Sequence, residues 1–182
     1  MAVLEMMGRF EAMVDQCRNR IYSLAYYSLG SKEEAEDITQ EVLIKLWQHW
    51  PSLEADHALP WTIRVAQNAC LDVHRKRQVR RAAATVECTG GNCPDNLPSP
   101  AADPATAMEQ SELRRQIETA LHKIEEPYRT IVILREIQDM SYEQIGDAMS
   151  MPLNTIKVYL HRGRRMLREL IREKIDYGTV GA

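Results

Sequence analysis

Long hydrophobic runs are missing from this 182-residue sequence. The longest apolar stretches, such as residues 131–134, are much shorter than the roughly 20 residues that a membrane-spanning helix needs. Arg9 and Glu11 interrupt the N-terminal region with charge, so no signal peptide is expected. The sequence therefore predicts a cytoplasmic protein without a membrane span.

Cysteine is also scarce. The chain has 4 cysteines at irregular spacing, which do not form a disulfide framework in a chain of this length. Cys17 and Cys70 fall on apolar stripes and are expected in the core. Cys88 and Cys93 have no second pair beside them, which favours exposed reduced thiols over a zinc site. A thiol-based sensor built on these two residues is the alternative.

Motifs for catalysis and cofactor binding are not found either. The sequence contains no nucleophile elbow, no phosphate-binding glycine loop and no paired-carboxylate motif. The histidines lack metal-ligand spacing, and His122 is expected to face solvent. We therefore expect no enzyme activity, no cofactor, no metal and no small-molecule substrate.

What the sequence does have is charge that is segregated along the chain. The whole chain carries a net charge of −3, but residues 31–60 carry −5, whereas residues 60–84 and 153–174 each carry +5. Two separate basic stretches suggest two contacts with a polyanion. The alternative is that each stretch is a solvated helix face.

Apolar residues repeat at intervals of three and four, which predicts an all-α protein. A first helix is expected to end near Gly30, and a capping box of Ser31 and Glu34 opens a second helix. Pro51 ends that helix, and Pro60 is expected in the first turn of a third, where its missing N–H costs nothing.

The middle of the chain interrupts this pattern. Residues 85–107 contain four of the 8 prolines and lack apolar periodicity, which predicts a flexible linker. Thr106 and Glu109 form a second capping box, which is expected to introduce the next helix. The predicted organisation is two small helical domains, with a domain at 1–84, a linker at 85–107, a second domain at 108–177 and a tail at 178–182.

The second domain contains a pattern typical of a helix-turn-helix. Ser141 and Gln144 form a capping box that opens a short helix, residues 150–152 break it, and a basic helix follows to about Lys174. On this last helix the apolar residues form one seam and the cations lie on the other side. Gly163 lies on the seam and allows a neighbouring helix to approach closely. Such a helix can enter the DNA major groove, whereas an ordinary surface helix is the alternative.

Two separate stretches resemble one known family. Residues 141–146 and 152–165 resemble the C-terminal promoter-binding domain of bacterial RNA polymerase sigma factors of the extracytoplasmic-function (ECF) class. Residues 35–42 and 61–72 are similar to the other domain of that class. The likeness covers both blocks in the same order, with a linker between them.

The resemblance implies three groups of site residues. Lys157, Val158, His161 and Arg162 match positions that face the groove at the minus-thirty-five element, although a small polar residue is common where Val158 stands. Thr155, Tyr159 and Arg165 match positions near phosphates. The minus-ten face is matched by Arg64, Asn68, Arg75 and Lys76, and Trp61 is assigned to it as a base-stacking ring, with packing as the alternative. The polymerase-binding positions are matched by Asp37, Gln40 and Glu41.

The same resemblance implies a function and its partners. It predicts a sigma factor that binds core RNA polymerase, directs promoter recognition and supports DNA opening for a stress- or signal-responsive regulon. Promoter DNA and an anti-sigma factor, often membrane-anchored in this family, are the other expected partners. The rival interpretation is a stand-alone helix-turn-helix repressor or activator, which leaves the acidic second helix unexplained.

Overall fold

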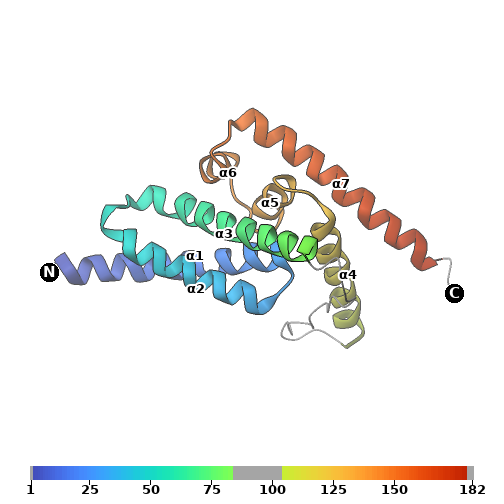
Figure 1. Ribbon diagram of the computed structural model, residues 1–182, viewed down its shortest axis with the longest axis horizontal. Coiled ribbons are helices and arrows are strands. Elements are labelled where there is room, and N and C mark those ends of the chain that lie inside the picture. Colours follow the sequence, from blue (N-terminus) through green and yellow to red (C-terminus); the bar gives the residue numbers. More distant parts are fainter. Residues whose placement is uncertain (1, 84–103, 180–182) are drawn as a thin grey trace.

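The structure, a computed structural model, describes residues 2–83 and 104–179, and all its regular elements are helical. No strand occurs among these residues, which confirms the all-α prediction. The elements are α1 (Ala2–Leu29), α2 (Lys32–His49), the 3-10 turn η1 (Trp50–Ser52), α3 (Ala55–Ala83), α4 (Pro104–Lys123), α5 (Tyr128–Val132), the π-helical turn η2 (Ile133–Ile137), α6 (Tyr142–Met149) and α7 (Leu153–Thr179) (Figure 1).

The turn between α1 and α2 lies where the sequence predicts it. Gly30 has a φ of 71°, a conformation that glycine adopts without strain, and it ends α1. The Ser31 hydroxyl accepts a hydrogen bond from the Glu34 amide at 3.3 Å. The Glu34 carboxylate pairs with Arg77 of α3. The hydroxyl side of the predicted capping box is therefore confirmed, while its carboxylate ties α2 to α3.

The third helix begins earlier than the sequence predicts. α3 starts at Ala55, so Pro60 lies inside the helix, and the prediction that Pro60 sits in its first turn was wrong. The reason is burial in the preceding turn. Ala58 is fully buried and Leu59 is 7% exposed, and helical backbone places both side chains against the core. Their burial offsets the hydrogen bond that proline cannot donate.

The helix after the predicted linker also begins early. α4 starts at Pro104, so Thr106 and Glu109 lie inside it and the predicted capping box does not open this helix. A proline suits the first turn of a helix, because its missing N–H would be unpaired there anyway. Residues 84–103, which make up most of the predicted linker and include Cys88 and Cys93, lie outside the described residues.

The helix-turn-helix pattern is confirmed in detail. The Ser141 hydroxyl accepts from the Gln144 amide at 3.2 Å, and the Gln144 side chain accepts from the Ser141 amide at 2.9 Å. Ser150, with a φ of 53°, ends α6. A Cβ added to Gly163 of α7 would lie 2.6 Å from Cγ2 of Val132, so the predicted close approach of a helix, here α5, is also confirmed.

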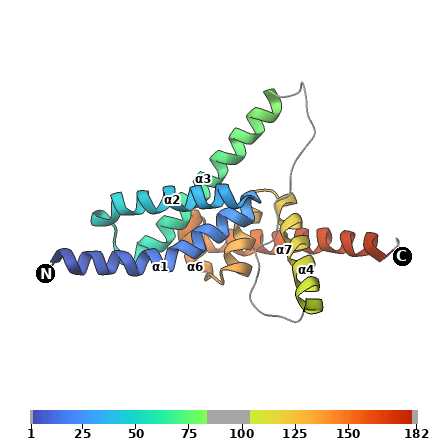
Figure 2. The ribbon, with the colours of Figure 1, turned by 90° about the horizontal axis from the view of Figure 1, so that it is seen from below.

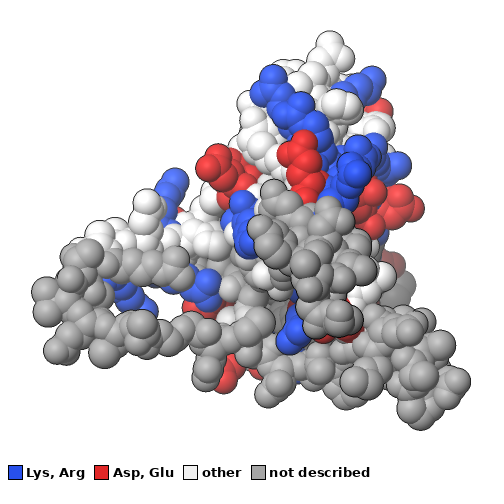
Figure 3. Space-filling view, turned by 90° about the vertical axis from the view of Figure 1, so that its right-hand side faces the viewer, with Lys and Arg blue, Asp and Glu red and all other residues white. Residues whose placement is uncertain are grey.

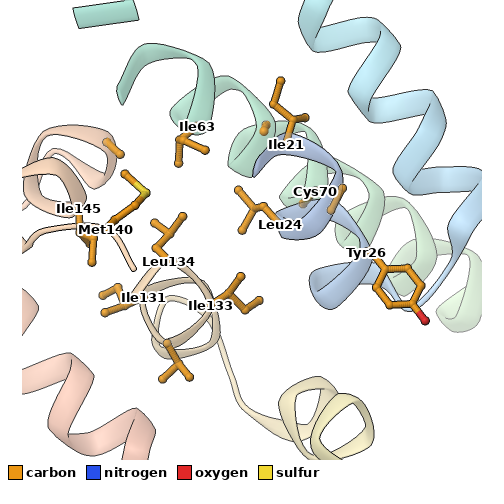
Figure 4. Close-up of a cluster of buried hydrophobic side chains, with 14 of the residues drawn as sticks. Ile21, Leu24, Tyr26, Ile63, Cys70, Ile131, Ile133, Leu134, Met140 and Ile145 are labelled. Atoms are coloured by element: carbon orange, nitrogen blue, oxygen red, sulfur yellow. The ribbon is translucent and has the colours of Figure 1, made fainter. Parts of the chain in front are cut away.

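The two halves of the chain share one hydrophobic core. Ile21 and Leu24 of α1 and Ile63 of α3 face Ile131 and Leu134 from the α5–η2 segment (Figure 4). Figure 1 places α5, α6 and α7 on one side of α1 and α3. Figure 2 shows the green end of α3 projecting away from α1 and α2. The predicted core positions of the two described cysteines, Cys17 and Cys70, are confirmed, because both thiols are buried.

Candidate nucleic-acid interface

Most of the residues expected at the minus-thirty-five element lie on the exposed face of α7. Ile156 and Leu160 are buried on the inner side of the helix. The outer side follows a spacing of three and four, which puts the side chains on one face. Thr155 is half-buried, Val158 is 48% exposed, and the other exposed members are Lys157, His161, Arg162 and Arg165.

The cations of α7 differ in their partners. Arg164 pairs with Glu136 at 2.6 Å, and Arg165 lies 3.7 Å from Glu169. Lys157 and Arg162 make no ion pair with any residue that the structure describes. Figure 3 shows Lys and Arg side chains gathered at the upper end of the molecule, where Figure 1 places α6 and the start of α7, with some acidic side chains among them. Lys157 and Arg162 are therefore available to bind an external anion.

Tyr159 lies differently from its neighbours on α7. It is half-buried, and its ring centroid is 5.0 Å from that of Tyr128 at the start of α5. Such a ring pair stabilises the contact between two helices beyond simple area burial. Tyr159 thus contributes to the packing of α7 on α5.

The residues expected at the minus-ten element lie along α3. Asn68, Arg75 and Lys76 are exposed, and Arg75 pairs with Asp72 at 3.1 Å. Trp61 is half-buried, with its ring centroid 5.2 Å from that of His49. Asn68, Arg75 and Lys76 thus form an exposed polar surface along α3, and the aromatic ring of Trp61 lies at one end of it.

Arg64 has a different role from the rest of this group. Its Nε donates to the Ala148 carbonyl at 3.1 Å, and its Nη2 donates to the Asp147 carbonyl. Both carbonyls lie in the last turn of α6, where helical carbonyls have no partner within the helix. Arg64 therefore binds the helix-turn-helix in this structure.

The expected polymerase-binding residues lie together on α2. Asp37, Gln40 and Glu41 are exposed at a spacing of three and one, and Glu41 pairs with Lys45 at 2.6 Å. The same outer stripe continues with two apolar side chains that the sequence reasoning did not assign to this site. Ile44 is 57% exposed and Trp47 is 49% exposed. The sequence did contain a signal for Ile44, because this apolar residue falls outside the apolar stripes through which α2 packs on its neighbours.

A buried arginine links the ends of several helices between the halves. Arg129 is only 8% exposed. Its Nη1 donates to the Ser28 carbonyl at 3.0 Å, and its Nε and Nη2 donate to the carbonyls of Ile124 and His122 at 2.9 and 3.2 Å. Nη1 also lies 3.0 Å from His74 Nε2. Carbonyls at the ends of α1 and α4 thus receive donors from one guanidinium.

The two histidines beside Arg129 are held neutral. Burial first, and then the charge of Arg129, lowers the pKa of His74 to about 4. The same two causes lower the pKa of His122. The expectation that His122 faces solvent was wrong, because Gly30 has no Cβ and leaves room for the ring. A Cβ at Gly30 would lie 2.7 Å from His122 Nε2.

Acidification should destabilise this cluster. The pKa of His74 is about 4 in the folded protein and 6.5 in the unfolded chain, so below pH 6.5 the unfolded chain binds a proton that the folded protein does not. Stability is then lost as the pH falls from 6.5 towards 4. Because His74 is half-buried and partly screened, we expect a loss of about 1 kcal/mol in the free energy of unfolding between pH 7 and pH 5.

Urea denaturation at the two pH values measures this loss. The variant His74→Asn, which has no titrating ring, should lose less stability over the same interval. An equal loss in wild type and variant would contradict the assignment to His74.

Two features that would indicate other functions are absent from the described residues. They contain no group of three or more His, Cys, Asp or Glu that could hold a metal ion. None of the helices in this part of the chain is long and apolar enough to cross a membrane.

Comparison with protein families gives two matches in the order of the two halves. The family model described as Sigma-70 region 2 matches residues 13–80. The model described as Sigma-70, region 4 matches residues 114–167. The first match covers most of α1–α3, and the second covers α5, α6 and parts of α4 and α7.

Curated relatives match nearly the whole chain. The ECF RNA polymerase sigma factor SigW of Bacillus subtilis is 31% identical over 167 residues, which span 90% of this chain and 89% of SigW. The ECF RNA polymerase sigma factor SigE of Mycolicibacterium smegmatis is 30% identical over 165 residues, which span 91% of this chain and 62% of SigE.

Two solved structures share the fold. One is the sigma factor RpoE in complex with the anti-sigma factor NepR from Bartonella quintana, with a TM-score of 0.67, 22% identity, and coverage of 90% of this chain and 96% of that one. The other is CnrH in complex with the cytosolic domain of CnrY, with a TM-score of 0.63, 18% identity, and coverage of 90% and 88%.

Proposed function

The chain belongs to the ECF sigma factors of bacterial RNA polymerase, and we propose that it binds core polymerase, directs it to promoters and supports opening of the DNA. The observation that carries this proposal is the match of both sigma regions, in order, on a chain that aligns with SigW over nearly its full length. The protein then acts in the cytoplasm as a specificity subunit, and the polymerase makes the bonds.

The minus-thirty-five element is assigned to the exposed face of α7. Lys157 and Arg162 supply donors that form no ion pair with a described residue, and such donors suit guanine edges in the major groove. His161 lies beside them, and the exposed apolar side chain of Val158 suits a thymine methyl group. Thr155, Tyr159 and Arg165 are assigned to phosphates, which position the helix without reading sequence.

The minus-ten element is assigned to α3. Asn68 offers an exposed amide to base edges, and Arg75 and Lys76 offer positive charge to the backbone. Trp61 provides an aromatic surface on which an unstacked base can rest. Arg64 can bind DNA together with these residues only after its hydrogen bonds to the carbonyls of α6 are broken. Residues 84–103 would then connect the half that binds the minus-ten element to the half that binds the minus-thirty-five element.

Core polymerase is assigned to the outer face of α2. Asp37, Gln40 and Glu41 give this face a negative charge that complements a basic partner. Ile44 and Trp47 add exposed apolar surface beside the charge. An aromatic side chain surrounded by polar groups is typical of the centre of a protein interface.

An anti-sigma factor is the proposed regulator. Two of the solved structures that share this fold hold a partner: RpoE is in complex with the anti-sigma factor NepR, and CnrH is in complex with the cytosolic domain of CnrY. Such a partner would cover the polymerase-binding face of α2 or the reading faces of α3 and α7. The exposed apolar residues of α2 are where we expect part of that contact.

A titration of this protein into bacterial core polymerase tests the proposal. We expect a saturable complex, and the variant Glu41→Lys should weaken it about ten-fold, because it reverses a charge on the assigned face. Glu125→Lys is the matched control, since it changes the same residue type at an exposed position outside α2. A core enzyme that forms no complex with the wild-type protein would refute the proposed function.

A further inference from the structure

One apolar side chain lies on the outer face of α7. Val158 is 48% exposed, and it belongs to neither of the hydrophobic clusters that the described residues form. It follows the fully buried Ile156 by two positions, which places it about 200° further round the helix. Val158 therefore lies on the side of α7 that is opposite the core, at the centre of the outer face.

Neither packing nor helix stability favours a valine at this position. Leu153 of the same helix is also exposed, but its Cδ2 lies against α6, where a Cβ added to Gly146 would be 3.6 Å from it. Val158 has no such place in a cluster. Valine also stabilises a helix less than alanine does, because its branched side chain is restricted by the preceding turn. The exposed valine is therefore explained better by an external contact than by the fold.

Polar residues surround Val158 on the helix surface. The positions three and four residues before and after it are its neighbours on the same face. They hold Asn154, Thr155, His161 and Arg162, of which only Thr155 is half-buried and the others are exposed. A single apolar side chain among hydrogen-bonding groups thus lies in the middle of the face that is assigned to the minus-thirty-five element.

The major groove presents one apolar group that such a side chain can contact. Thymine displays a C5-methyl group there beside its O4 acceptor, whereas cytosine displays an N4 amino donor and has no methyl group. The valine side chain has no hydrogen-bond donor or acceptor, so it bonds neither O4 nor N4. Its contact with a pyrimidine therefore depends on the C5 substituent and not on the polar groups that distinguish thymine from cytosine.

We infer that Val158 reads one pyrimidine of the minus-thirty-five element by its C5-methyl group alone, so that 5-methylcytosine can replace thymine there. This inference rests on the proposed function, which assigns the outer face of α7 to that element. It adds a ligand class, the 5-methylpyrimidines, and a consequence for regulation. A promoter with cytosine at this position becomes a better site when the cytosine is methylated at C5.

A selection first locates the base that Val158 reads. Holoenzyme made from bacterial core polymerase and the full chain transcribes a promoter mapped on genomic DNA, with its minus-thirty-five element randomised, and the transcribed templates are sequenced. We expect the wild-type protein to favour thymine at one position and the variant Val158→Ala to lose that preference alone. Alanine is a good helix former, so this exposed substitution keeps α7 intact.

Four templates that differ only at the located base then test the role of the methyl group. They carry thymine, uracil, cytosine or 5-methylcytosine. Thymine and uracil both pair with adenine, and the two cytosines both pair with guanine, so each pair of templates differs by one methyl group. With templates in competition, we expect the methyl group to raise transcription about four-fold in both pairs. With Val158→Ala, both differences should disappear.

A second valine supplies the matched control. Val79→Ala makes the same change at a valine of α3 that is 69% exposed, and it should leave both methyl effects in place. The inference is overturned if the wild-type protein selects no thymine, if it transcribes the thymine and uracil templates equally, if the cytosine pair shows no methyl effect, or if Val158→Ala retains the effects. A wild-type holoenzyme that transcribes no promoter at all would instead refute the proposed function.

Discussion

Replacing both Lys157 and Arg162 by alanine should lower promoter-specific transcription about 100-fold while leaving the affinity for core polymerase unchanged. Each good contact with a base edge contributes about 1–3 kcal/mol, and the loss of two together corresponds to about this factor. Both side chains are exposed on α7, and no described carboxylate holds either one. Their removal therefore costs the fold little. In vitro transcription with purified core enzyme measures the effect.

The control for this pair lies on the same helix. Arg164→Ala also removes a cation from α7, but Glu136 already neutralises that charge at 2.6 Å. We expect a much smaller effect on transcription from this variant. Normal transcription by holoenzyme that carries both alanines would show that the reading face is assigned wrongly.

Replacing Arg129 by methionine should lower the free energy of unfolding by about 3–5 kcal/mol. Methionine keeps much of the buried volume but removes the guanidinium that donates hydrogen bonds to the carbonyls of Ser28, His122 and Ile124. It also leaves Glu126, whose carboxylate lies 3.8 Å from Arg129, without this partner. Breaking a buried charged network by removing one member is strongly destabilising. Urea denaturation at pH 7 measures the loss.

A surface arginine provides the comparison. Arg115→Met removes an exposed guanidinium that pairs with Glu112 at 2.9 Å within α4. A solvent-exposed pair of this kind contributes at most about 1 kcal/mol. If both methionine variants lose similar stability, the buried network does not have the energetic role that its geometry indicates.

The sequence was sufficient for features that depend on neighbouring residues. The spacing of apolar residues predicts the helices, and the Ser141–Gln144 capping box predicts the start of α6, because each pattern acts within one or two turns. The close approach at Gly163 was also predictable, since a missing side chain on an apolar seam leaves room for another helix. These features establish the helix-turn-helix, and with it the exposed face of α7 that is assigned to the minus-thirty-five element.

Features that depend on distant residues could not be predicted in this way. Arg129 and Ser28 are separated by 101 positions, so no local pattern marks their bond. The placement of Arg64 against α6 is of the same kind, at separations of 83 and 84 positions. Arg64 was expected on the minus-ten face from its family position, but its hydrogen bonds depend on how the halves pack.

Gly30 illustrates how one position can carry two unrelated constraints. Its positive φ closes the turn after α1, and its missing Cβ accommodates the ring of His122. A smaller residue at position 122 would restore the space that a side chain at position 30 needs, but it would not relieve the backbone strain. A smaller residue at position 122 therefore compensates only in part for the loss of Gly30. A protein without this glycine would need changes in both the backbone of the turn and the contact with α4.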